Sequence, residues 1–286
     1  MNSITCPKCK SSGVVKRGFT PTSERGKQQR YLCKSCKHAF LLDAGFWKMK
    51  NKAEMVTMAV DMYLSNLSSR HMRNQLWRHF RVKVSHVTIL NWVRKYVRKV
   101  SGFLRQQRLN LTGKAYVDET EIGRDDKKGV LWCSVDWDSR FISASLYSPR
   151  EQNMDDAVAF LRRVKENGRP CRIQTDGLLM YPRAIKKVFY SRYKERWVEH
   201  KALNFTETKK YNVRIETVFS KLKDRIADFR GIKSRKTALL VEGIIIQHNY
   251  IERHSTTGKV PCELAGMDLG LGDDRWMGLI GMASSR

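Results

Sequence analysis

The sequence lacks any apolar run approaching the roughly 20 residues that a membrane-spanning helix needs. Between Met1 and Cys9 it also lacks the apolar stretch of a secretory signal. The first absence argues against a membrane partner, and the second argues against secretion. We therefore expect a cytoplasmic protein, in which cysteines are metal ligands or core residues before they are disulfides.

Acidic residues are scarce, and they are scarcest at the start of the chain. The 286 residues include 28 acidic against 55 basic ones, a net charge of +27. Residues 1–110 hold 4 acidic and 23 basic residues, which leaves 24 and 32 for the rest, a net of only +8 there. A generically basic protein would not concentrate its charge in this way. A basic segment binds a polyanion because each neutralised phosphate releases condensed counterions.

Composition divides the chain into three segments and a tail. Residues 1–44 are rich in Cys, Lys and Gly, residues 46–112 are helical and basic, and residues 113–255 alternate strand and helix patterns. Residues 256–286 contain six glycines and are expected to form a poorly structured tail. A hydrophobic content of 41% is enough for a buried core.

Four cysteines in the first segment form two C-x-x-C pairs, separated by 23 residues that suit a β-hairpin. Two such pairs can place four thiolates around one tetrahedral Zn²⁺. Two disulfides or a redox-active pair are the alternatives, and a reducing compartment disfavours the disulfides. The sequence predicts a zinc ribbon whose ligands are Cys6, Cys9, Cys33 and Cys36.

The second segment predicts three helices, over 52–65, from Ser68 or Ser69 to Trp77, and from 86 to about 100 with Ser85 as N-cap. A short helix, a turn and a longer basic helix is the helix-turn-helix pattern, although a bundle with a solvated basic face shares it. The last helix would meet base edges through Ser85, His86, Thr88 and Asn91, and phosphates through Arg94, Lys95, Arg98 and Lys99.

The third segment predicts strands over 114–122, 130–136 and 141–147, a helix over 154–166 and a strand over 171–177. Helices over 181–189 and from 212 onward come next. Three antiparallel strands, a helix and a parallel strand is the order of a ribonuclease-H-like α/β core, a mixed five-stranded sheet with flanking helices. In that fold the first and fourth strands are neighbours, so Asp118 and Asp176 would meet at their ends.

Three motifs make a resemblance specific: Asp118-Glu119-Thr120, Thr175-Asp176-Gly177 with Tyr181 after it, and Ile215-Glu216 within 212–216. They resemble the catalytic motifs of bacterial and archaeal insertion-sequence transposases of the DDE class. The stretches 221–225, 229–231 and 248–254 are similar to the region after the glutamate in that family. The zinc ribbon and the helix-turn-helix ahead of the core extend the resemblance to nearly the whole chain.

The resemblance implies an enzyme that binds the terminal inverted repeats of a transposon, cleaves at its ends and joins the 3′-OH to target DNA. It implies a catalytic triad of Asp118, Asp176 and Glu216 that holds Mg²⁺ or Mn²⁺, since two such ions serve nucleophile and leaving group. Its partners would be double-stranded DNA and further copies of the chain on that DNA, in the nucleoid. A non-enzymatic DNA-binding regulator with a decayed core, and another nuclease of this fold, are the alternatives.

The third ligand is the least certain of the triad. Thirty-nine residues separate Asp176 from Glu216, more than the family's usual spacing, and the excess would lie in 191–210, rich in Lys, Arg and Glu. Glu199 and Glu207 are therefore rivals. Glu216 is favoured because Lys223 lies seven residues on, and seven residues turn a helix by about 700°, back to nearly the same face. A metal-binding carboxylate and a phosphate-binding cation would then share one cleft.

The remaining polar residues have plainer interpretations. Alternation along a strand places Glu119 and Glu121 on the opposite side from Asp118. Asp136 and Asp138 suit a turn. Cys133 and Cys171 suit the core, and metal binding is a weak alternative for His200, His248 and His254.

Overall fold

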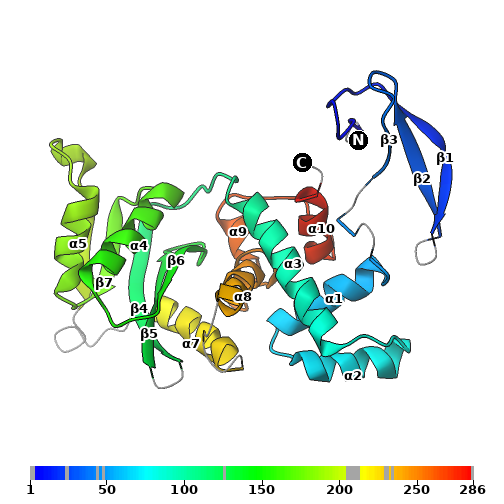
Figure 1. The fold of residues 1–286 in the computed structure, drawn as a ribbon. Coiled ribbons are helices and arrows are strands. Elements are labelled where there is room, and N and C mark those ends of the chain that lie inside the picture. Colours follow the sequence, from blue (N-terminus) through cyan, green and yellow to red (C-terminus); the bar gives the residue numbers. More distant parts are fainter. Residues whose placement is uncertain are drawn as a thin grey trace. The chain divides into compact units, whose positions relative to one another are not determined.

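The computed structural model describes residues 4–22, 26–42, 45–46, 49–124, 127–203, 213–228, 232 and 235–284. The chain divides into two compact units (Figure 1). Unit 1 comprises Met1–Tyr63, Ser69–Arg105 and Gly270–Arg286, and unit 2 comprises Leu64–Ser68 and Gln106–Leu269. None of the helices in the described part of the chain combines the length and apolarity that crossing a membrane requires.

The N-terminal segment forms a three-stranded antiparallel sheet in the order β1-β2-β3. Its strands are β1 (Val14–Thr22), β2 (Gly26–Cys33) and β3 (Ala39–Leu41). The predicted hairpin is present, with longer strands than expected and a third strand that the sequence did not indicate. Only a few side chains are buried here, Tyr31 among them, so a bound ion would be needed to stabilise so small a module.

The basic segment forms three helices close to the predicted bounds: α1 (Ala53–Leu64), α2 (Ser69–Phe80) and α3 (His86–Leu104). The Ser85 hydroxyl accepts a hydrogen bond from the Thr88 amide, so Ser85 caps α3 as predicted. The predicted apolar stripe of α3 is buried, namely Ile89, Trp92, Val93, Tyr96, Val97 and Val100. Helices α2 and α3 contact each other across a short turn, which is the arrangement of a helix-turn-helix.

The expectation of a poorly structured tail is wrong. Residues 256–284 contain α9 (Pro261–Leu264) in unit 2 and α10 (Arg275–Met282) in unit 1. The Asp274 side chain caps α10 by accepting from the Met277 amide, and its other oxygen accepts from Thr57 at 2.6 Å. Trp276 and Leu279 are buried. Gly278 serves close packing, because a Cβ there would collide with the Leu271 carbonyl.

Unit 2 is built around a five-stranded mixed sheet in the order β6-β5-β4-β7-β8. The first three strands, β4 (Lys114–Arg124), β5 (Lys127–Asp136) and β6 (Ile142–Ser148), form an antiparallel meander. Two parallel strands, β7 (Arg172–Asp176) and β8 (Glu199–Leu203), extend the sheet beside β4. This is the predicted ribonuclease-H-like sheet, with its first and fourth strands adjacent.

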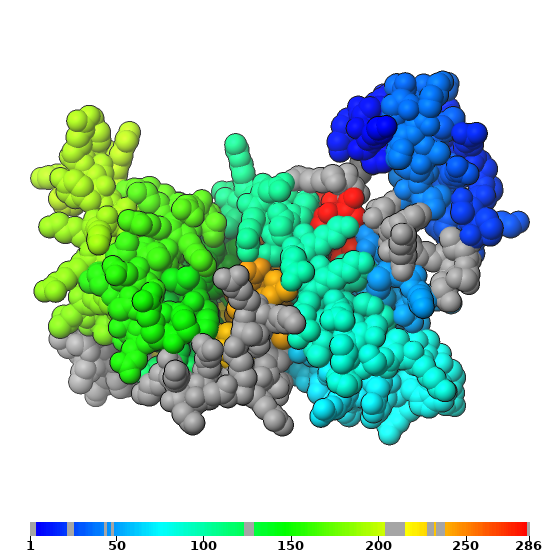
Figure 2. Space-filling model, viewed as in Figure 1, coloured from blue at the N-terminus to red at the C-terminus, as the bar shows by residue number. Residues whose placement is uncertain are grey.

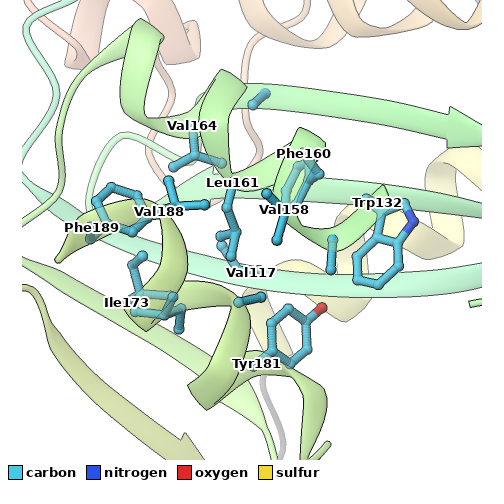
Figure 3. Close-up of a cluster of buried hydrophobic side chains, with 14 of the residues drawn as sticks. Val117, Trp132, Val158, Phe160, Leu161, Val164, Ile173, Tyr181, Val188 and Phe189 are labelled. Atoms are coloured by element: carbon cyan, nitrogen blue, oxygen red, sulfur yellow. The ribbon is translucent and has the colours of Figure 1, made fainter. Parts of the chain in front are cut away.

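Two helices, α4 (Met154–Asn167) and α5 (Met180–Phe189), pack against one face of the sheet. Figure 3 shows their side chains interleaved with Val117, Trp132 and Ile173 from the strands. On the other face, α7 (Val213–Asp228) contacts β4 and β5 (Figure 1). The sheet therefore has a helical layer on both sides, which fixes the parts of β4 and β7 that carry the acidic residues.

A helical segment near the end of unit 2 binds the edge strand β6. Helix α8 (Arg235–Ile246) continues into one π-helical turn, Gln247–Ile251, a geometry frequent at functional sites. The buried Asn249 amide accepts from the Ile142 backbone at 2.8 Å and donates to the Ile142 carbonyl at 2.9 Å. The π-turn thereby satisfies backbone groups at the start of the edge strand β6.

Candidate functional site

Asp118 and Asp176 lie at the same level of two adjacent parallel strands. Strands β4 and β7 pair Lys114 with Arg172 and Tyr116 with Gln174. Each aspartate lies two residues beyond this last pair, so the strand register alone places the two aspartates next to each other. Sequence reasoning predicted this proximity.

Three carboxylates meet there. One oxygen each from Asp118, Glu119 and Asp176 lies within 4.8 Å of the others. Glu119 corrects the sequence interpretation, which used strand alternation to place it away from Asp118. Its backbone does alternate, but its longer side chain brings a carboxylate oxygen within 4.8 Å of the other two acids, beside the end of β7.

Burial and mutual repulsion make this cluster a candidate cation site. Burial, followed by the neighbouring Glu119 charge, raises the pKa of Asp118 to about 7. Burial likewise raises the pKa of Glu119 to about 7. A divalent cation would offset the cost of gathering these charges, and clustered carboxylate oxygens are the ligands that Mg²⁺ prefers.

Two neighbours hold Glu119 in place. The Tyr181 hydroxyl donates a hydrogen bond to one carboxylate oxygen, and Gln152 donates to the other at 2.7 Å. Burial, and then the Glu119 charge, raises the pKa of Tyr181 well above its usual range, so this hydroxyl keeps its proton. Tyr181 was noted in the sequence for its place after Asp176, but no local pattern linked it to Glu119.

The third predicted ligand, Glu216, lies in the first turn of α7 and is exposed. Its charge contributes to the raised pKa of Asp118, after burial, Glu119 and Asp176. It is not one of the three acids that meet within 4.8 Å in the described part of the chain. Lys223, two turns along α7, is also exposed.

Glu199 and Glu207 are the alternatives to Glu216 as third metal ligand. Glu199 opens β8 and forms an ion pair with Arg172 at 2.7 Å, whereas Asp176 pairs with Leu203 at the other end of the strand. This places Glu199 a full strand length from the carboxylates and removes it as a ligand. Glu207 lies outside the described residues.

The three histidines have structural partners, and the two cysteines predicted for the core differ in burial. His248 Nε2 donates to the Arg140 carbonyl at 3.0 Å, His254 contacts the Arg140 guanidinium at 2.7 Å, and His200 contacts the Thr175 hydroxyl at 2.9 Å. Cys133 is buried as predicted, but Cys171 is exposed, because it precedes β7 instead of lying within it.

Asp136 is confirmed as a turn residue. Its carboxylate accepts from the amides and hydroxyls of Thr112 and Ser139, the shortest contact being 2.6 Å. These bonds fix the turn between β5 and β6, so Asp136 is not available for chemistry.

The four N-terminal cysteines form a second cluster. Their sulfurs lie within 4.8 Å of one another, with Cys6 and Cys36 3.6 Å apart and Cys9 and Cys33 3.5 Å apart. Four thiolates at ~2.3 Å around a tetrahedral Zn²⁺ would lie about 3.8 Å apart, so the geometry fits that ion. All four are free thiols, which argues against the disulfide alternative.

The two halves of this cluster share one backbone design. The Lys10 amide donates to the Cys6 carbonyl, and the Lys37 amide donates to the Cys33 carbonyl. Lys10 and Lys37 have positive φ angles of 59° and 58°, so each C-x-x-C turn closes the same way. A hydrogen bond from the Cys36 amide is the main reason that the pKa of the Cys33 thiol falls to about 6, which favours the thiolate form.

The candidate DNA-reading face of α3 is only partly open. Asn91, Lys95 and Arg98 are exposed, whereas His86, Thr88, Arg94 and Lys99 are half-buried. The Ser85 hydroxyl is occupied as a cap and also contacts the Thr88 hydroxyl at 2.9 Å. The contact residues on α3 stay predictions.

Comparison with known proteins identifies the class that this sheet and its acidic edge indicate. Residues 113–254 match the family model of a DDE domain. The relatives that the chain matches are insertion-sequence transposases, so residues 113–254 are similar to the DDE domain of that family.

Two relatives come from Staphylococcus aureus. The chain is 28% identical over 131 residues to the transposase for the insertion sequence-like element IS431mec, and equally so to that for IS257 in transposon Tn4003. Each alignment covers 46% of this chain and 57% of the relative, so the chain spans little more than half the length of the curated relatives it matches.

Two solved structures show a distant likeness. Both are HTLV-2 integrase catalytic core domains in complex with magnesium, with TM-scores of 0.38 and 0.41 and identities of 16% and 15%. They cover 56% and 55% of this chain and 99% and 97% of those chains. Likeness at this level is too distant to bear on activity.

Proposed function

We propose that the chain is a DNA transposase that binds the ends of its element, cleaves there and joins the 3′-OH to target DNA. The observation that carries the proposal is the meeting of Asp118 and Asp176 at one sheet edge, with Glu216 on the adjacent helix. Asp118, Asp176 and Glu216 would hold Mg²⁺ or Mn²⁺. When bound, these ions supply the Lewis acidity that phosphoryl transfer needs at both the entering and the leaving oxygen.

The side chains of this chain have separable roles in the proposal. Asp118 and Asp176 supply ligand oxygens from rigid strands, and Glu216 adds one from α7. Glu119 adds negative charge at the same point, oriented by Tyr181 and Gln152. Lys223 would bind a DNA phosphate. The zinc ribbon and α3 would bring the transposon end to this site, and further copies of the chain would assemble on the DNA.

A strand-transfer assay tests the proposal. Duplex DNA that carries the inverted repeats flanking the gene would be incubated with the full chain, Mg²⁺ or Mn²⁺, and a target plasmid. We expect nicking at the repeat end and joined product, both of which require the divalent ion and disappear in Asp118→Asn. Binding of the repeat without cleavage under any divalent ion would instead support a regulator. Cleavage without joining would support another nuclease of the same fold.

A further inference from the structure

The segment between α5 and β8 combines exposed aromatic rings with positive charge. Tyr190, Tyr193 and Trp197 are 68%, 41% and 55% exposed. From 183 to 197 the sequence has six basic residues and one acidic residue. This yellow-green segment projects from the surface of unit 2 in Figure 2. None of the roles proposed above uses it.

Internal contacts hold the rings and the cations of this segment in a fixed arrangement. The Arg192 and Arg196 guanidinium groups lie 4.8 Å and 5.2 Å from the centre of the Tyr193 ring. The Trp197 indole nitrogen donates to the Ser191 carbonyl at 2.7 Å. These contacts orient the Tyr193 and Trp197 side chains while 41% and 55% of their surfaces stay exposed, which reduces the entropy lost when a ligand binds.

A hollow of about 650 Å³ adjoins these rings, and Tyr190, Arg196 and Trp197 line it together with Arg169 and Cys171. Arg169 donates to the Phe189 and Arg196 carbonyls at 2.9 and 2.7 Å, which ties the segment to the start of β7. Its volume falls in the range of small-ligand pockets, so a nucleobase with its sugar fits within it. We call Arg169, Tyr190, Arg192, Tyr193, Arg196 and Trp197 the aromatic–basic surface.

We propose that the aromatic–basic surface binds unpaired nucleotides of a DNA strand, with bases stacked on Tyr193 and Trp197 and phosphates beside the arginines. Exposed rings alternating with cations are the pattern of single-strand binding sites. A duplex keeps its base faces stacked internally and offers nothing to these rings, whereas phosphate binding alone needs no rings. That the strand is DNA rests on the proposed function.

The surface is distinct from the carboxylate site. It lies where β7 and β8 begin, and Asp176 ends β7 four residues later. Four residues of strand span about 13 Å, a distance that a few nucleotides of an unpaired strand can cover. The surface would therefore hold nucleotides that lie a few positions from the cut, where a strand becomes unpaired.

Photocrosslinking with the full chain tests the inference directly. A single-stranded DNA of about 12 nucleotides, a length within the range that such sites bind, would carry 5-iodouracil, and the adducts would be mapped by mass spectrometry. We expect adducts on Tyr193 or Trp197. Adducts confined to residues 4–105 would overturn the proposal. Because this readout uses the unaltered protein, it does not depend on whether a variant folds.

Affinity measurements add a matched comparison. Tyr193→Ala combined with Trp197→Ala should weaken binding of the single strand about tenfold or more and leave duplex binding unchanged. Tyr193→Phe with Trp197→Phe should retain binding, and so should Arg162→Ala, which removes an exposed charge on α4. Tighter binding of the matching RNA, or a change only in oligomeric state, would overturn the assignment to DNA.

The assays separate this inference from the proposed function. If the surface crosslinks to DNA but the chain never cleaves its repeat ends, the proposed transposase activity is wrong and the proposed nucleotide binding still holds. If the chain cleaves and joins DNA but no crosslink forms at that surface, only the proposed nucleotide binding is wrong.

Discussion

The Tyr181 hydroxyl donates a hydrogen bond to the Glu119 carboxylate, and this contact links the apolar core to the cluster of three carboxylates. The Tyr181 ring is buried among the side chains of Figure 3. Its hydroxyl and Gln152 together engage both oxygens of Glu119. A carboxylate held from both sides can orient only one way toward Asp118 and Asp176.

Replacing Tyr181 by Phe should weaken metal binding while leaving the core packed. The loss of a partner that orients a metal-site residue typically costs about 10- to 100-fold in metal affinity or activity. We expect a corresponding increase in the Mn²⁺ concentration for half-maximal cleavage, and in the Kd from calorimetric titration. Tyr147→Phe is the matched control, since that hydroxyl lies 3.5 Å from the Ile232 carbonyl. An unchanged Kd in Tyr181→Phe would show that Glu119 needs no such support.

Asp118→Asn, Asp176→Asn and Glu216→Gln should each reduce cleavage by at least about 10³-fold, since a lost metal ligand removes several kcal/mol of transition-state stabilisation. Binding to the repeat should persist, because the basic N-terminal segment supplies it. Glu199→Gln is the control, as its carboxylate pairs with Arg172. An active Glu216→Gln together with an inactive Glu207→Gln would transfer the third position to Glu207.

Zinc analysis of the full chain should give one ion per chain, bound by Cys6, Cys9, Cys33 and Cys36. Cys9→Ser should lower the zinc content and destabilise the N-terminal sheet, because so small a module draws its stability from the metal. Cys171→Ser, at an exposed free thiol, should retain the ion. Purified, reduced protein without zinc would refute the ribbon.

The fold was predictable wherever a pattern repeats along the sequence. Helix α3 follows from Ser85 and an apolar stripe that reaches Val100, and the pairing of β4 with β7 follows from the strand order. Strand β8 was missed because it is an edge strand without alternating burial, as its Glu199–Leu203 side chains are exposed or half-buried. Its composition matches that of a solvated loop.

The sequence predicts those site residues whose positions follow from strand order and from the direction of the Cα–Cβ bond. Asp118 and Asp176 follow from strand order, but Glu119 does not, since alternation describes where a Cβ points and not how far a side chain extends. The contact between Glu119 and Tyr181 joins residues 62 positions apart. Helix and strand periodicities extend over only a few residues, so they cannot predict such a contact.

Acidification should destabilise unit 2 through His248. Burial, partly offset by the Arg140 carbonyl, lowers the pKa of His248 to about 4, and Lys221, His254 and Arg140 oppose its protonation. The unfolded chain binds this proton near pH 6.5, so the stabilisation is complete above 6.5 and is lost as the pH falls toward 4. At pH 5 the loss is about 2 kcal/mol.

Chemical denaturation of the wild type and His248→Gln at pH 7.5 and 5 would measure this loss. The glutamine amide can replace the Nε2 donor but does not titrate. The variant should therefore lose about 2 kcal/mol less than the wild type on acidification. Equal losses would mean that His248 titrates normally in the folded protein.

Helix α3 should recognise the ends of the element through two separable classes of contact. Base-edge hydrogen bonds discriminate between sequences, while phosphate contacts act alike on all of them. Asn91→Ala or His86→Ala should thus cost about 1–3 kcal/mol on the cognate end and much less on random DNA. Arg98→Ala or Lys99→Ala should weaken both, and reduce the salt dependence by about one unit of slope per contact. Isotherms at several salt concentrations on both DNAs would separate the two classes. If both classes of variant lose affinity equally on the two DNAs, α3 does not read the sequence, and specificity must come from the zinc ribbon or the catalytic core.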